Sequence, residues 1–172
     1  MCEKNKKVYV VSDSEQYLKG ICLFLTRVKK SYLVINSENI DKPKQSQFLE
    51  NPDKYLKEKK PQVVLISCIP PSIEIDYFNE GTCVYFGKVV PVVLSYMMHR
   101  VRFLNKFSIV IAPNTRKKKL EEDGNVLFLD PVYKGLSREL VEIQAQDNKQ
   151  LNDYENCFLM LAKKNGIKVS DV

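Results

Sequence analysis

Glycine is scarce in this sequence, and it is missing where a nucleotide-binding protein needs it. The chain has six glycines in 172 residues, and residues 7–12 form an apolar run that predicts a first strand. The polar turn after it, residues 12–16, holds neither Gly nor Gly-Lys-Ser/Thr, so it lacks the loop whose backbone N–H groups enclose a phosphate. Asp13 and Glu15 place two carboxylates where the anion would lie. The scaffold is typical of nucleotide binders, but its phosphate site is missing.

Other motifs of nucleotide enzymes are absent as well. A GTPase needs a magnesium-binding carboxylate after its third strand and a base-reading motif after a later one. Residues 68–71, which follow the predicted third strand, read Cys-Ile-Pro-Pro, and residues 95–98 read Ser-Tyr-Met-Met, with no Asn-Lys-x-Asp. The Gly-x-Gly-x-x-Gly fingerprint of dinucleotide-binding folds does not occur in the sequence. We therefore expect no cofactor and no enzyme activity.

A receiver domain shares this general architecture and is only partly matched. Asp13 and Glu15 could serve as its acidic pair. The phosphorylatable Asp that should follow the third strand is replaced by Ser67-Cys68, and residues 112–114, Ala-Pro-Asn, stand where a late Lys is needed. The site of phosphoryl transfer is thus incomplete.

Histidine and paired cysteines are scarce too, which argues against a metal site. His99 is the one histidine, and the five cysteines stand apart at positions 2, 22, 68, 83 and 157, whereas zinc sites need clustered ligands. Cys68 follows a predicted central strand and His99 could act as its base, but we prefer a structural thiol and a surface His. No apolar segment reaches the roughly 20 residues of a membrane helix, and the polar start predicts no signal peptide. We therefore expect reduced thiols and no membrane contact.

Basic residues outnumber acidic ones, which gives a net charge of +6. This charge favours acidic partners, nucleic acid included, but only as a long-range bias. The excess is dense at Lys54, Lys57, Lys59 and Lys60, and in the run Arg-Lys-Lys-Lys at 116–119. Such runs are typical of solvated surface, so we expect nucleic acid to be reached only indirectly, through a protein complex.

Apolar runs that alternate with helical patterns predict one α/β domain over residues 1–172. The runs are continuous, which is typical of a parallel sheet covered by helices on both faces. We predict strands at 7–12, 32–36, 62–67, 88–95 and 126–129, and helices at 14–28, 72–84, 134–145 and 150–164. Residues 37–61 are predicted to be a long mobile loop with one helical turn at 52–57. The expected fold class is a three-layer α/β domain with a mainly parallel sheet.

The segment 96–122 is open to two interpretations. It forms either a short helix at 96–105, an additional strand at 107–112 and a helix at 115–122, or one irregular insertion over 97–113. The basic start and acidic end of 115–122 oppose the helix dipole, which disfavours a stable helix there.

Helical spacing predicts which side chains face the core. In the first helix the inward face is Tyr17, Ile21, Phe24, Leu25 and Val28, with Leu23 off it. In the helix at 134–145 it is Leu136, Leu140 and Ile143. In the last helix it is Leu151, Tyr154, Phe158, Leu161 and Ala162. That assignment leaves Leu159 at the flank of the last helix and Met160 on its opposite side.

Several segments resemble the centromere protein M family, pseudo-GTPases of the inner kinetochore. They are 7–12 with its glycine-free turn, 61–69, 85–89 (Tyr-Phe-Gly-Lys-Val), 126–130 (Val-Leu-Phe-Leu-Asp) and the Leu-rich helix 151–161. Residues 97–122 depart from the family pattern. The resemblance implies a Ras-like (small GTPase-like) fold that neither binds nor hydrolyses GTP, and a nuclear location at the centromere. It also implies docking onto the helical-repeat protein centromere protein I, in a complex with centromere proteins H and K.

Two functions remain open from the sequence. The first is a non-catalytic interaction subunit of the inner kinetochore. The second is a small flavodoxin-like or receiver-like ligand-binding regulator or enzyme that uses the ends of strands one, three and four. The first is favoured because those ends lack glycine and clustered titratable residues. A subunit of this kind should expose apolar residues where its partner docks, and the candidate partner-binding residues are Leu159, Met160, His99, Arg102 and Phe103.

Overall fold

The computed structural model describes residues 6–104, 107–113, 119–129 and 131–164. The chain divides into two compact units. One consists of Met1–Phe86 and Val93–Ala112, the other of Gly87–Val92 and Pro113–Val172. The described part of the first unit holds a sheet, and that of the second is helical. The single domain expected over residues 1–172 stays a prediction.

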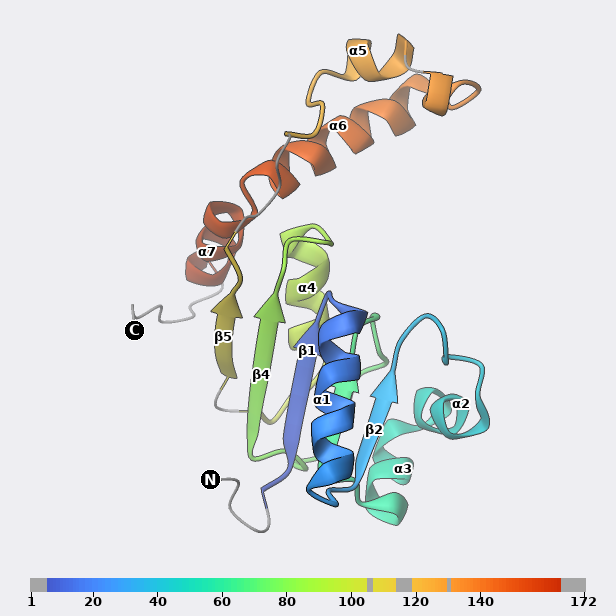
Figure 1. Ribbon diagram of the computed structural model, residues 1–172, viewed down its shortest axis with the longest axis vertical. Helices are drawn as coiled ribbons and strands as arrows, with labels where there is room; N and C mark the ends of the chain where they lie inside the picture. Colours follow the sequence, from blue (N-terminus) through green and yellow to red (C-terminus); the bar gives the residue numbers. More distant parts are fainter. Residues whose placement is uncertain (1–5, 105–106, 114–118, 130, 165–172) are drawn as a thin grey trace. The chain divides into compact units, whose positions relative to one another are not determined.

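The first unit is built on a five-stranded sheet in which each strand is parallel to its neighbours (Figure 1). The strands are β1 (Val8–Ser12), β2 (Tyr32–Ile35), β3 (Val63–Ile66), β4 (Glu80–Tyr85) and β5 (Phe107–Ile111). Their order across the sheet is β2-β3-β1-β4-β5, with β1 at the centre. This confirms the α/β fold class with a parallel sheet, and the strands expected near 7–12, 32–36, 62–67 and 107–112.

Helix α1 (Glu15–Arg27) covers one face of the sheet over β1 and β3 (Figure 1). Its buried Leu18 and Leu25 pack against Val10 of β1 and Leu65 of β3. Burying side chains of this size contributes roughly 1.5–3 kcal/mol each. The continuous apolar runs of the strands are explained by cover on both faces, since one set of alternate residues meets α1 and the other set faces the opposite side.

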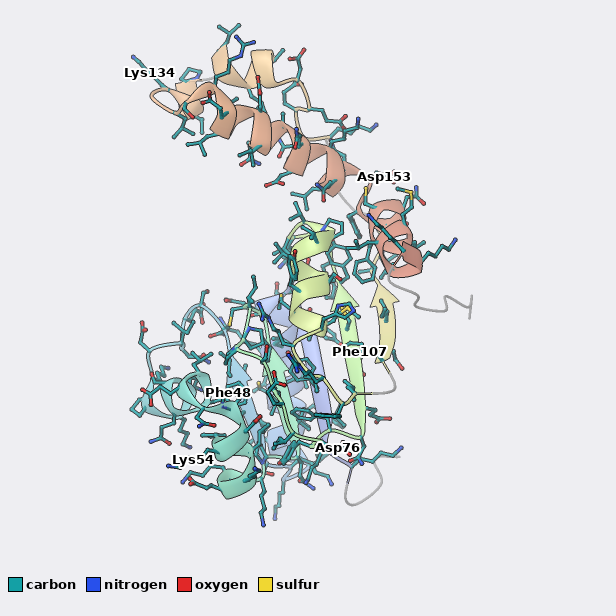
Figure 2. All side chains as sticks on the ribbon, turned by 180° about the vertical axis from the view of Figure 1, so that it is seen from behind. Phe48, Lys54, Asp76, Phe107, Lys134 and Asp153 are labelled. Atoms are coloured by element: carbon teal, nitrogen blue, oxygen red, sulfur yellow. The ribbon has the colours of Figure 1, made fainter. Side chains whose placement is uncertain are left out.

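Tyr9 is the anchor of the opposite face. Its ring lies 5.3 Å from that of Phe78 and 6.5 Å from that of Phe107, which Figure 2 labels. The hydroxyl donates to the backbone carbonyl of Met97, at 3.0 Å, in α4 (Pro91–Met98). Burial raises the pKa of Tyr9, so this hydroxyl stays protonated and its hydrogen bond fixes the ring in the core.

Residues 37–61 were predicted to be a long loop with one helical turn at 52–57. The turn is confirmed as part of a longer helix, but the loop is wrong because the segment contains two helices. These are α2 (Pro43–Glu50) and α3 (Pro52–Lys59), each with a proline in its first turn, where the missing N–H costs nothing. Asn51 ends α2 and caps α3, since its side chain accepts the N–H of Lys54 at 3.0 Å. Phe48 and Leu56 are fully buried and attach the two helices to the unit. The apolar residues of this Lys-rich segment therefore decide its structure.

The predicted helix at 72–84 and strand at 88–95 are wrong. Ile73 forms a bridge to Val101, with no helix around it, and the strand β4 begins at Glu80. Pro91 begins helix α4, which is a position where proline fits a helix and not a central strand. Periodicity does not distinguish a strand from a helix in short apolar runs. A strand therefore lies where a helix was predicted, and a helix where a strand was predicted.

The described part of the second unit holds α5 (Gly124–Leu129), a 3₁₀ turn (Pro131–Tyr133), α6 (Arg138–Asn152) and α7 (Tyr154–Lys164). A strand was expected at 126–129, and this is wrong because Leu127 packs in a helix against Val141 and Ala145 of α6. The helix expected at 150–164 is interrupted at Asp153, labelled in Figure 2, which separates α6 from α7. Of the helix expected at 115–122, residues 114–118 lie outside the described residues, and Lys119–Glu122 is not helical.

Two of the three predicted helix faces are wrong. In α1, Phe24 is 58% exposed, and Leu18, absent from the predicted face, is fully buried. Of the face predicted for the helix at 134–145, Leu140 and Ile143 of α6 are exposed, and so is Leu136, which precedes α6. The third face is confirmed, since α7 buries Tyr154, Phe158 and Ala162 and exposes Met160.

Candidate functional site

The turn between β1 and α1 is closed by its own side chains. Ser12 Oγ donates to the carbonyl of Val84 at 2.7 Å and accepts the N–H of Ser14 at 3.2 Å. Asp13 Oδ1 accepts the N–H of Phe86, at 2.8 Å. Ser14 caps α1, since its Oγ accepts the N–H of Tyr17 at 3.4 Å. Two N–H groups at the start of α1, those of Ser14 and Tyr17, are therefore used by side chains of the turn itself.

Side chains around this turn add acidic groups and an aromatic contact. Glu15 Oε1 accepts a hydrogen bond from the hydroxyl of Ser37, with 2.7 Å between the two oxygens. The ring of Tyr17 lies 5.4 Å from that of Phe86. With Asp13 buried below, the amino end of α1 carries carboxylates, which oppose an anionic ligand.

Cys68 does not have the environment of a nucleophile. Burial raises the pKa of its thiol, and the nearby Glu15 carboxylate raises it further, whereas a reactive cysteine needs a lowered pKa. The imidazole of His99 is engaged elsewhere, because its Nδ1 lies 2.7 Å from the carbonyl of Ser95 and 3.3 Å from the hydroxyl of that residue. These contacts fit the preferred interpretation of a structural thiol and a surface His.

The predicted partner-binding residues fall on two separate units. Leu159 and Met160 belong to α7 in the second unit, whereas His99, Arg102 and Phe103 belong to the first. All three residues of the first unit are exposed, and Arg102 Nε pairs with Glu74 Oε2 at 2.9 Å. The structure therefore does not bring the five residues together as one surface of either unit.

An apolar groove lies on α7. It has a volume of about 260 Å³ and is lined by Pro91, Val92, Gln150, Cys157, Met160, Leu161 and Lys164, all in the second unit. Met160 is 67% exposed, whereas Leu159 is half-buried and is not part of the lining. Burial raises the pKa of Cys157, with Asp153 adding to the shift, so the thiol is neutral at physiological pH and extends the apolar wall. Polar groups stand only at Gln150 and Lys164.

Sequence reasoning missed an exposed apolar surface on α6 because it placed that surface in the core. Leu136, Leu140 and Ile143 are 45%, 52% and 54% exposed. A signal for it was present in the distribution of charge. Residues 120–153 carry eight acidic and three basic side chains, in a chain whose net charge is +6. An acidic segment within a basic chain marks a separate surface.

Neither a metal-binding cluster nor a membrane-spanning helix is found among the described residues. Across that part of the chain, no group of three or more His, Cys, Asp or Glu side chains is placed to hold a metal ion. Among the helices described, none has the length and apolar character needed to cross a membrane.

Comparisons with known proteins give structural likenesses but no sequence match. No family model matches the sequence, and no curated protein matches it. Among solved structures, the chain is similar to the C-terminal part of the Fun30 ATPase domain, with a TM-score of 0.46 and 16% sequence identity. The likeness covers 88% of this chain, and the chain spans about half of that protein, 49%.

Proposed function

We propose that this chain is a non-catalytic interaction module that docks a helix of a partner protein in the apolar groove on α7. The observation that carries the proposal is Met160, a large apolar side chain that is mostly exposed and stands at the groove. Exposed apolar side chains that gather at one groove mark a docking site. The closed turn between β1 and α1 supports the non-catalytic part of the proposal.

The size and lining of the groove favour side chains of a protein over a cofactor. Its volume of about 260 Å³ lies below the roughly 300–1,000 Å³ of typical small-molecule pockets. Among the lining residues, only Gln150 and Lys164 carry strongly polar side chains, so few hydrogen bonds would orient a polar ligand. A partner helix that inserts one or two apolar side chains beside Met160 fits these properties.

The resemblance to the centromere protein M family supplies the specific form of this proposal. The chain would be a subunit of the inner kinetochore, in the nucleus, with the helical-repeat centromere protein I as partner and centromere proteins H and K in the same complex. Nucleic acid would be reached only through that complex.

Co-purification after co-expression with centromere proteins I, H and K tests this form. We expect the wild type to co-purify, Met160→Glu to be lost from the complex, and the melting temperature to stay unchanged because Met160 is exposed. Asn156→Glu is the matched control, since it adds the same charge to the exposed side of α7 outside the groove. Failure of the wild type to co-purify would reject the kinetochore assignment. Equal retention of Met160→Glu would show that the groove is not the docking site.

A second candidate function has one observation in its favour. Asn36 Oδ1 and Ser67 Oγ are buried and have no hydrogen-bond partner among the described residues. They follow the paired ends of β2 and β3, where Ile35 is in register with Ile66. Open α/β sheets bind ligands at the carboxyl ends of their strands. A small ligand-binding regulator of flavodoxin-like or receiver-like type is therefore the alternative, and ligand-dependent stabilisation tests it.

A further inference from the structure

Helix α6 has two faces of different character. Val141, Ala145 and Asn148 are buried. Val141 and Ala145 pack with Leu127 of α5, and Asn148 Nδ2 donates to the carbonyl of Glu121 at 2.6 Å. With 3.6 residues per turn, Leu140 and Ile143 share the opposite face of α6. Leu136 lies just before the N-cap Ser137, and each of the three side chains is about half exposed. We call these three residues the α6 stripe.

The helical hairpin that carries the α6 stripe exposes further apolar side chains. Val126 and Leu129 of α5 and Val132 in the 3₁₀ turn add further exposed apolar area in the same hairpin, and Figure 2 labels Lys134 in the turn that leads into α6. The buried core between α5 and α6 consists of Leu127, Val141 and Ala145. Helices in proteins gain most of their stability from packing an amphipathic face, and a core of this size leaves the second face of α6 without cover from α5.

The charges beside the α6 stripe are acidic. Asp147 continues the line of the stripe one turn after Ile143, and Glu139 flanks it, as helical spacing requires. The pKa of Glu139 is lowered because its own backbone N–H and the Ser137 hydroxyl hydrogen-bond to its carboxylate. The basic residues of α6, Arg138 and Lys149, lie away from the stripe on the helix, and Arg138 Nε is 3.3 Å from Glu142 Oε1.

We propose that the α6 stripe binds an amphipathic, basic helix of a partner protein. Apolar side chains of that helix would cover Leu136, Leu140 and Ile143, and its Lys or Arg side chains would pair with Glu139 and Asp147. The sign of the charge selects this occupant, because residues 120–153 have a net charge of −5. A second copy would place like charges together, which costs affinity. The inference rests on the proposal that the chain is an interaction module, but not on the groove of α7.

A designed peptide pair tests the chemistry directly. The probe is a fluorescein-labelled 21-residue helix with Leu at heptad positions a and d and Lys at e and g. The control peptide is the same except that it has Glu at e and g. We measure binding to the full chain by fluorescence anisotropy at about 0.1 M salt. The Lys peptide should bind at least tenfold more tightly than the Glu peptide, and this preference should shrink as salt screens the charges.

Three variants locate the site. The double variant Leu140→Gln, Ile143→Gln should bind the Lys peptide at least tenfold more weakly, although its charge is unchanged. Circular dichroism checks that its helices are kept. The double variant Glu139→Gln, Asp147→Asn should bind the Lys peptide severalfold more weakly, and its affinity should depend less on salt. Met160→Gln, in the α7 groove, should bind like the wild type, so failure of the α6 proposal and failure of the groove proposal give different results.

Several outcomes would overturn the proposal. Equal binding of the Lys and Glu peptides would remove the charge argument. Unchanged binding by the Leu140→Gln, Ile143→Gln variant would place the site elsewhere. A concentration-dependent dimer in sedimentation velocity that the same variant abolishes would show that a second copy covers the stripe.

Discussion

Gly87 is the residue whose backbone most clearly requires glycine. Its φ of +69° lies in the left-handed region, and an added Cβ would meet the ring of the buried Tyr154, in the same unit. A left-handed conformation costs a residue with a Cβ about 1–2 kcal/mol, and overpacking a buried neighbour costs about 1–3 kcal/mol. The position therefore has two independent reasons to exclude any side chain.

Gly87→Ala should lower the free energy of unfolding by about 2–5 kcal/mol, measured by urea denaturation. Gly20→Ala is the control, because Gly20 lies inside α1 and an added Cβ would meet nothing within 4 Å. That change should stabilise the protein by about 1 kcal/mol through helix propensity alone. An equal loss in both variants would contradict the local geometry at Gly87.

For single residues, the sequence indicated which residue types were missing from a site, but not which residues contact each other. The missing glycines after β1 led to the expectation that the turn holds no phosphate. The bond that closes the turn, from the N–H of Phe86 to Asp13 Oδ1, joins residues far apart in the chain, and no local pattern reveals such a pair. Exposure of Met160 was correctly predicted because α7 has one well-defined apolar stripe.

At the scale of elements, α1 shows why a helical face can be misassigned. Tyr17, Phe24 and Val28 recur at helical spacing, but they are at least one-third exposed, and the sheet is met by Leu18 and Leu25. Two apolar faces compete on this helix, and spacing alone does not rank them. The choice is made by Val10 and Leu65, which lie beneath Leu18 and Leu25 in the sheet.

Substitutions in α1 separate the two assignments. Phe24→Asp and Leu23→Asp should each cost about 1 kcal/mol or less, since the two side chains are 58% and 70% exposed. Leu25→Asp should cost several kcal/mol or abolish soluble protein, because it buries an unpaired charge in the core. Soluble yield and urea denaturation measure the difference. A severe effect of Phe24→Asp would restore the face predicted from spacing.

Prolines account for other differences between expectation and structure at this scale. Pro43 was taken as part of a loop and Pro91 as a bulge in a strand, yet each begins a helix, whereas the helical turn predicted to begin at Pro52 is confirmed. A proline is compatible both with a loop or bulge and with the first turn of a helix, because it ends one element and fits the start of the next. The apolar residues that follow decide, and their burial depends on tertiary packing.

At the scale of the whole molecule, charge and apolar surface are unevenly distributed. The chain is basic overall, whereas residues 120–153 are acidic. The parallel sheet was predictable because buried strands are continuous apolar runs. The helix Gly124–Leu129 was not, because a short apolar run does not separate helix from strand by periodicity. A segment whose own core is small while its outer face is apolar is typical of a binding element.

Nucleotide binding separates the two proposed functions. A thermal-shift series with GTP, ATP, FMN and NAD at about 1 mM should move the melting temperature by less than about 1 °C, because the turn after β1 uses its own polar groups. A ligand bound with a Kd of about 10 µM would stabilise the fold by about 2.7 kcal/mol, and for a chain of this size that shift is roughly 5–10 °C. The two results are therefore easily separated. If one ligand does stabilise the wild type, Ser67→Ala decides its place: loss of the shift would move the function to the ends of β2 and β3, as the alternative requires.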